Sequence, residues 1–250
     1  MRAIILGSGS KGNSTLLIGK EKKILIDVGF SYPKMIKDLG EYNYKPSDID
    51  AILITHTHKD HIGGLGTFIK RNHIPVYTNS IMSEELSKTI PMDSMILNDD
   101  TYQIGEFNIV AIHTSHDAPG SVGFIIDNNG SSLVYITDTG YLNQKNLKKL
   151  INKNVYIMES NHDINMLMTG PYPYVLKQRV LSDKGHLSNE ASGNYLKEII
   201  GDATKRIILA HLSEINNTPL IAIKTVEEIV NSNLKIEAAS QNESFDIGEF

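Results

Sequence analysis

The chain has 250 residues, and its 24 Lys+Arg against 29 Asp+Glu give a formal net charge of −5. A hydrophobic share of 40% and a charged share of 21% are ordinary for globular proteins and exclude a disordered or fibrous chain. The absence of cysteine excludes disulfides, a thiolate nucleophile and a cysteine-ligated metal. We expect a single domain over residues 1–250.

The apolar runs, such as Ala51–Ile54, are too short for a membrane-spanning helix or for the core of a signal peptide. We therefore expect a cytoplasmic protein without a membrane partner. The mildly acidic charge neither requires nor excludes a nucleic acid, because bound metal ions add positive charge locally. Basic residues gather in the stretches 145–153 and 177–184, which we interpret as solvated helix faces.

Short runs rich in Ile, Val and Leu alternate with helical patterns along the chain. Strands are predicted over 2–6, 14–18, 23–27, 50–55, 74–78, 107–113, 122–127, 132–137, 155–159 and 206–210. Helices are predicted over 33–40, 63–71, 80–88, 143–151, 170–179, 189–200 and 218–231. The turn at 128–130, with sequence Asn-Asn-Gly, is typical of an antiparallel hairpin. Two β-rich sections, each followed by helices, predict an α/β fold with two sheets packed face to face and helices outside.

Side chains that bind metals follow several of the predicted strands, at the point where each strand ends. They are Asp27, His56, His116, Asp138 and His211. Strand ends are rigid positions along one edge of a sheet, where a site can be preorganised.

The sharpest motif is His56-Thr57-His58-Lys59-Asp60-His61, followed by Gly63-Gly64. Two histidines two residues apart on an extended chain point the same way. Asp60 and His61 follow where the chain turns toward a helix, so they can face a second ion. Imidazole suits zinc and its neighbours, and carboxylate suits harder ions. These four ligands do not complete two metal spheres, and we expect His116, Asp138 and His211 to supply the rest.

This pattern resembles the metallo-β-lactamase superfamily, whose five motifs can each be placed in order along the chain. Asp27 matches the first motif, a buried carboxylate behind the metal ligands, and residues 56–61 match the second. The third, fourth and fifth motifs correspond to His116, Asp138 and His211. The resemblance implies one ion on His56, His58 and His116 and another on Asp60, His61 and His211, with Asp138 bridging both. It also implies a four-layer αββα sandwich.

Glu159 and the segment Gly185-His186-Leu187-Ser188 are similar to the RNase Z branch, in which such a histidine and glutamate act at the scissile phosphate. His186 also precedes a helix capped by Ser188, whose N-terminal N–H groups favour an anion. The strings 7–14, 159–163, 168–173 and 211–217 look like the YycJ/WalJ family of bacterial hydrolases. That resemblance implies 5′→3′ exonuclease activity on DNA.

We therefore predict a phosphodiester hydrolase with two divalent ions, zinc or manganese, that hold a bridging hydroxide. Asp60, His186 and Glu159 are the expected catalytic residues, with His186 assisting the leaving oxygen and Glu159 orienting it. Asn161 and His162 are candidates for contact with the substrate phosphate. Lys11 and Asn13 in the opening loop are further candidates, although such Gly- and Ser-rich segments are usually only turns.

Other functions stay open. A small thioester, lactone or cyclic phosphodiester would use the same metal motif, and the acidic charge suits such a substrate. A non-catalytic metal-binding protein is the third hypothesis. The stretch 163–185 is interpreted as buried core, with a lid or a homodimer contact as the alternatives.

Overall fold

The computed structural model describes residues 1–250 and consists of two seven-stranded sheets that pack face to face. The first sheet has the strand order β14-β1-β2-β3-β4-β5-β6, and the second has the order β13-β12-β11-β10-β9-β8-β7. The first contains β1 (Arg2–Gly7), β2 (Ser14–Ile18), β3 (Lys23–Ile26), β4 (Ala51–Leu53), β5 (Val76–Thr78), β6 (Met95–Leu97) and β14 (Phe245–Glu249). The second contains β7 (Thr101–Ile104), β8 (Phe107–His113), β9 (Val122–Asn128), β10 (Ser131–Ile136), β11 (Val155–Glu159), β12 (Arg206–Ala210) and β13 (Lys235–Ala238).

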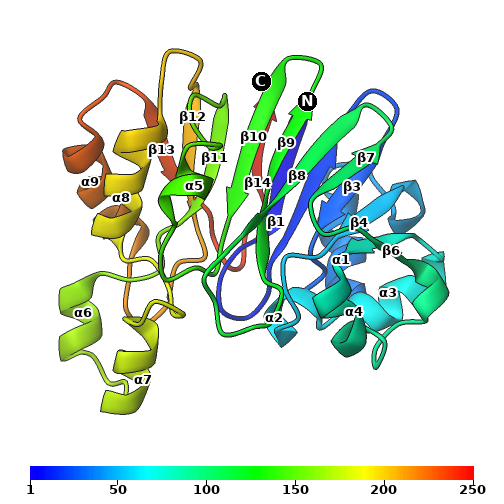
Figure 1. Cartoon of the computed structure of the whole chain (residues 1–250), viewed down its shortest axis with the longest axis horizontal. Coiled ribbons are helices and arrows are strands. Elements are labelled where there is room, and N and C mark those ends of the chain that lie inside the picture. The colour runs from blue at the N-terminus through cyan, green and yellow to red at the C-terminus, as the bar shows by residue number, and fades with distance from the viewer.

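Helices cover the outer face of each sheet, which gives the four layers α, β, β, α (Figure 1). The helices α1 (Tyr32–Gly40), α3 (Leu65–Asn72) and α4 (Ser80–Leu86) lie on the first sheet. The helices α5 (Gln144–Leu147), α8 (Asn189–Ile199) and α9 (Pro219–Val230) lie on the second sheet. The remaining helical segments are α2 (Lys59–Ile62), α6 (Ile164–Thr169), α7 (Tyr174–Val180), η1 (Pro46–Asp48) and η2 (Met92–Ser94). The predicted fold class, an αββα sandwich, is confirmed.

The central strands of the second sheet are buried on both faces, because their side chains alternate between the core between the sheets and the outer helices. In β10, Leu133 and Tyr135 face the core between the sheets, whereas Val134 and Ile136 pack under the outer helices. This two-residue period is why its central strands read as continuous apolar runs. The hairpin between β9 and β10 turns through Asn129 and Gly130, both with positive φ (49° and 91°), as a two-residue type I′ turn requires.

The ten predicted strands all form, and the four that the sequence did not predict are β6, β7, β13 and β14. These four strands are the two edges of each sheet. An edge strand has one neighbour and a solvated side, so it needs no continuous apolar run. β6, for example, has two exposed residues out of three.

The helix predicted over 170–179 is wrong in its start, because residues 170–173 (Gly-Pro-Tyr-Pro) form a link between α6 and α7. A proline removes a backbone donor and restricts the residue before it, so the link cannot be helical throughout. The expectation of buried core over 163–185 is also wrong. Tyr174 and Val175 are 71% and 79% exposed, and Met168 is exposed as well. None of the helices combines the length and the apolar character that crossing a membrane requires.

Candidate metal centre

The candidate site lies at one end of the two sheets, beside α2 at the bottom of Figure 1. Three of its residues come at the ends of strands: Asp27 follows β3, Asp138 follows β10 and His211 follows β12. All three have left-handed backbone angles (φ 61°, 55° and 57°). Such angles cost energy for residues other than glycine and cluster at functional sites. The turn that ends each strand therefore points a polar side chain into the gap between the sheets.

Asp27 holds His61 in one orientation. Its carboxylate is fully buried and accepts hydrogen bonds from the Thr55 backbone N–H and hydroxyl, both at 2.8 Å. The same carboxylate lies 2.7 Å from His61 Nδ1. Because Nδ1 is engaged there, Nε2 of His61 faces the site, 3.4 Å from Asp60 Oδ2 and 3.2 Å from Asp138 Oδ2. An imidazole fixed in this way is the usual arrangement of a metal-binding histidine.

A second group brings His56, His58 and His116 together, with one nitrogen of each within 4.8 Å of the others. His116 Nδ1 lies 3.3 Å from the Gly185 carbonyl oxygen, so its Nε2 faces inward, 3.2 Å from His58 Nδ1. His56 Nε2 is buried and has no hydrogen-bond partner. Burial, together with His61, lowers the pKa of His56 well below its usual value, which keeps this imidazole neutral and able to bind a metal.

Asp138 lies between the two groups. Its Oδ1 is 3.4 Å from His211 Nε2 and 3.8 Å from His116 Nε2, and its buried Oδ2 faces His61 Nε2 at 3.2 Å. Burial opposes ionisation of Asp138, but His211 and His61 outweigh it and hold the pKa of this carboxyl well below its usual range. Asp60, His61 and His211 form the other group of ligand atoms within 4.8 Å of one another.

The donor set fits divalent ions. It combines buried imidazoles, ionised carboxylates and a buried ligand atom without a hydrogen-bond partner, His56 Nε2. Without an ion, protons supply the positive charge: burial lowers the pKa of His211, but Asp138, Asp60 and Glu159 raise it to about 10. A metal ion that binds here would replace such protons, since imidazole ligates in its neutral form. This cluster therefore implies divalent metal ions.

The buried Glu159 pairs with the half-buried His186 next to this cluster. Glu159 Oε1 lies 2.7 Å from His186 Nδ1, and Oε2 accepts from the backbone N–H groups of Thr139 (2.9 Å) and Leu187 (3.2 Å). Burial opposes ionisation of Glu159, but the neighbouring His186 lowers its pKa to about 2. In turn, burial lowers the pKa of His186, but Glu159 and Asp138 together raise it above its usual value, which favours the protonated ring.

A cavity of about 310 Å³ opens onto the cluster, and His58, Asp60, His116, Asp138, His186 and His211 all line it. Asn161 lines it too, and its amide donates to the His211 carbonyl oxygen at 2.9 Å. His162 does not line the cavity: it is 1% exposed, neither ring nitrogen has a partner, and burial lowers its pKa to about 4. The structure therefore brings together every predicted site residue except His162, with Asp27 in contact from behind.

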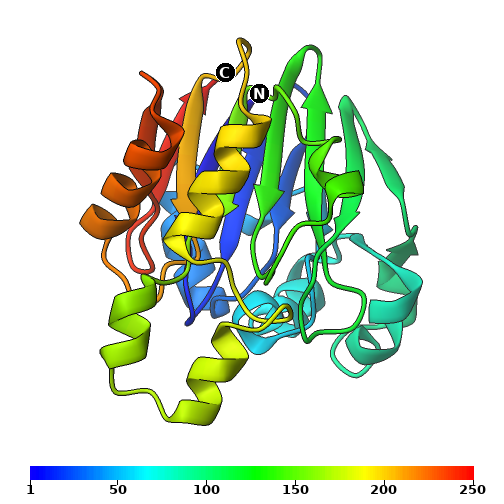
Figure 2. The same cartoon turned by 60° about the vertical axis from the view of Figure 1, so that its left-hand side comes forward.

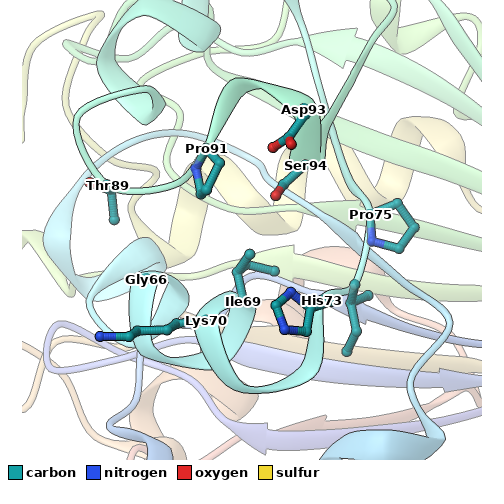
Figure 3. A pocket seen from close by; sticks show the side chains of 10 residues that line it. Gly66, Ile69, Lys70, His73, Pro75, Thr89, Pro91, Asp93 and Ser94 are labelled. Atoms are coloured by element: carbon teal, nitrogen blue, oxygen red, sulfur yellow. The ribbon is translucent and has the colours of Figure 1, made fainter.

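A larger cavity of about 670 Å³ lies on the outer side, between α3 and the segment 89–94 (Figure 3). Lys70 and His73 stand on one wall and Asp93 on the other, and no group of metal ligands converges there. Size alone therefore does not identify the functional site.

Two contacts at the metal centre were not predicted. Asn13 is fully buried, and its amide nitrogen lies 2.9 Å from His61 Nε2 and 3.4 Å from Asp60 Oδ2. Asp117 Oδ1 lies 3.3 Å from His58 Nε2. Asn13 was weighed only as a substrate contact, and the one signal for Asp117 is its position directly after His116.

Comparisons with known proteins agree with this geometry. The family described as "Beta-lactamase superfamily domain" matches residues 22–212. Exodeoxyribonuclease WalJ of Streptococcus pneumoniae serotype 2 is 38% identical over 240 residues, which cover 93% of this chain and 89% of WalJ. Exodeoxyribonuclease YycJ of Bacillus anthracis is 36% identical over 231 residues, which cover 90% of this chain and 88% of YycJ.

Among solved structures, the metallo-β-lactamase fold protein YhfI from Bacillus subtilis matches with a TM-score of 0.73. The match covers 98% of this chain and all of YhfI, at 18% identity, and shows a shared fold alone. The two packed sheets and the histidine–carboxylate cluster thus define a protein of the metallo-β-lactamase class. The chain belongs to the metallo-β-lactamase superfamily, and within it to the family of WalJ and YycJ.

Proposed function

We propose that the protein is a metal-dependent phosphodiester hydrolase that degrades DNA from its 5′ end. One observation carries the proposal: the Asp138 carboxylate lies between two groups of inward-facing imidazoles, beside the His186–Glu159 pair. Relatives 36–38% identical over about nine-tenths of the chain are named exodeoxyribonucleases, which supports DNA as the substrate. Because the ligands come from both sheets, we propose that residues 1–250 act as a single domain.

Two divalent ions, zinc or manganese, would be held by His56, His58 and His116 on one side and by Asp60, His61 and His211 on the other, with Asp138 shared. When bound, such ions polarise the phosphate and make a water molecule nucleophilic near neutral pH. Asp27 keeps the proton of His61 on Nδ1, away from the ligand nitrogen. Gly185 does the same for His116 through its carbonyl oxygen.

His186 is the proton donor of the proposed reaction. Water adds to phosphorus, the P–O3′ bond breaks, and His186 gives its proton to the departing O3′ before taking one back from solvent. Glu159 holds Nδ1 of His186 and favours the protonated ring, so Nε2 is the nitrogen left to reach the substrate. The products are a nucleotide with a free 3′ hydroxyl and a strand one residue shorter with a 5′ phosphate.

The test is a gel assay on 5′-labelled duplex DNA with manganese-loaded protein, run beside Asp138→Ala. We expect short labelled products from the wild type and none from Asp138→Ala. Asp93→Ala, which removes an exposed carboxylate far from the cluster, is the matched control and should behave as the wild type. Intact DNA in the wild-type lane, with turnover of a thioester, lactone or cyclic phosphodiester, would move the assignment to a small-molecule substrate.

A further inference from the structure

A helical arm, residues 163–185, stands apart from the two sheets. It contains α6 and α7, which project beyond the end of the sheets in both views (Figures 1 and 2). Between residues 164 and 184, one side chain makes a hydrogen-bonded ion pair with the rest of the protein: Arg179, which contacts Asp117. Arg179 thus ties the arm to the loop that carries His116, while the buried Leu167 anchors α6.

The arm supplies the wall of the metal cavity that faces the predicted ligands. The three apolar residues that line this cavity, Tyr172, Leu176 and Val180, all come from the arm. The other walls are ionic or polar. A nucleotide bound with its phosphate at the metal ligands needs an apolar surface for its base and sugar, and aromatic rings serve sequence-tolerant stacking of bases. Tyr172 stands between Pro171 and Pro173, which restrict its backbone and so limit the entropy lost on binding.

Arg179 is the only lysine or arginine that lines the cavity. Its Nε and Nη2 both lie against Asp117 Oδ2, at 2.8 and 2.6 Å. A guanidinium carries five N–H donors, so this pairing orients the group and leaves donors for a second anion. The other oxygen of Asp117 lies 3.3 Å from His58 Nε2 and 3.5 Å from His116 Nε2. One carboxylate therefore separates the guanidinium from the metal ligands.

The arm also adjoins the proposed proton donor. The backbone N–H of His186 donates to the Val180 carbonyl oxygen at 3.0 Å, across a tight turn that ends at Gly185. A Cβ at Gly185 would lie 2.2 Å from that same oxygen, so the turn needs glycine. In 5′→3′ cleavage the O3′ that leaves belongs to the 5′-terminal nucleotide. The terminal nucleotide therefore belongs on the side of His186, against the arm.

We propose that the arm forms the subsite for a 5′-phosphorylated terminal nucleotide, with Tyr172 and Leu176 against its base and sugar and Arg179 on its 5′ phosphate. This inference rests on the proposed 5′→3′ nuclease function and adds a preference to it. The enzyme distinguishes a 5′-phosphate end from a 5′-hydroxyl end, and Arg179 is the residue that does so.

The experiment compares kcat/KM for the same duplex with a 5′ phosphate and with a 5′ hydroxyl, using the manganese-loaded full chain. The wild type should prefer the phosphorylated end by about tenfold or more, the range expected for hydrogen bonds to a charged group. Arg179→Ala should bring the ratio close to one, mainly through KM, and Arg179→Lys should keep part of it. Both kcat/KM values in the ratio are measured on the same variant, so a loss of metal-site activity lowers both equally and leaves the ratio unchanged.

Two further variants sharpen the result. Lys177→Ala, on the same helix, removes a side chain that donates to the Met168 carbonyl oxygen and does not line the cavity, so the wild-type ratio should persist. Tyr172→Ala should raise KM about tenfold for both ends, the scale of one stacked base, and Tyr172→Phe should not.

The outcomes separate this inference from the proposed function. Degradation of both ends at equal rates by the wild type overturns the inference alone, and so does an unchanged ratio in Arg179→Ala. Wild-type protein that hydrolyses bis(p-nitrophenyl) phosphate but leaves both duplexes intact overturns the proposed function and the inference with it.

Discussion

Replacement of Asp27 probes how the metal centre is built. In Asp27→Ala, the Thr55 N–H, the Thr55 hydroxyl and the His61 Nδ1–H all lose their acceptor in a fully buried place. At about 1–3 kcal/mol for each unsatisfied group, the cost is about 3–9 kcal/mol. That cost is comparable with the whole stability of a domain, about 5–15 kcal/mol, so we expect Asp27→Ala to fold poorly.

Asp27→Asn is the informative change. Asparagine tolerates the positive φ of this position, and its oxygen can still accept from the Thr55 N–H. Its NH₂ group would replace the oxygen that faces His61 Nδ1, and the ring proton would then be favoured on Nε2, the ligand nitrogen. Loss of such a partner typically lowers metal affinity about 10–100-fold.

The assay is competition for manganese or zinc between the protein and a chelating dye, with thermal melting of the metal-free proteins to compare their folding. Ser14→Ala is the matched control, because it removes a buried donor to the Asp27 backbone carbonyl oxygen but leaves the contact between the Asp27 carboxylate and His61. It should lose less affinity than Asp27→Asn. Wild-type affinity in a well-folded Asp27→Asn would refute the reasoning.

Three further outcomes are expected. His186→Ala should lower kcat by about 10²–10⁴-fold, as for loss of a general acid, with unchanged bound metal measured by mass spectrometry; a small change would remove His186 from the reaction. Phe68→Ala, in the buried face of α3, should lower the free energy of unfolding in urea by about 3–5 kcal/mol. Hydrogen bonds from Arg2 lower the pKa of Asp246 below its ordinary value of 3.8. The pair therefore stabilises the fold fully at pH values above 3.8, and this stabilisation is lost as the pH falls through the lowered pKa. Asp246→Asn should therefore lower stability at pH 7 by at most about 1 kcal/mol and leave stability near pH 2 unchanged, as followed by urea unfolding at both pH values.

The central strands could be predicted from sequence and the edges could not, for one physical reason. β1 and β10 are buried on both faces over most of their length, so residues 3–6 and 133–136 are continuous apolar runs. β14 and β13 are edge strands of mixed polarity, and their place in the sheets depends on pairing with β1, at the other end of the chain, and with β12, across the helix α9. Local patterns carry no record of that pairing.

The same distinction holds for the metal centre. His56, His58, Asp60 and His61 are found by a local motif, and Asp138 and His211 by their positions just after strands. Contacts made across the fold leave little local signal. The Asn13 amide reaches His61, 48 positions along, and the Gly185 carbonyl reaches His116, 69 positions away.

The arm was misjudged because its residue types suggested burial. Met168, Tyr174 and Val175 are apolar, and in an ordinary domain such residues are usually inside. Here the two prolines of the link at 170–173 separate short helices that extend beyond the sheets, and only Leu167 and Val180 are buried. Exposed apolar groups beside a site are a reason to look for a ligand.

The most direct test of a two-ion DNA hydrolase is to titrate manganese into metal-free protein while following both bound ion and the rate of duplex degradation. We predict two bound equivalents per chain, with the rate rising as the second one binds. A full rate at one equivalent, or no degradation of DNA with two equivalents bound, would contradict the account.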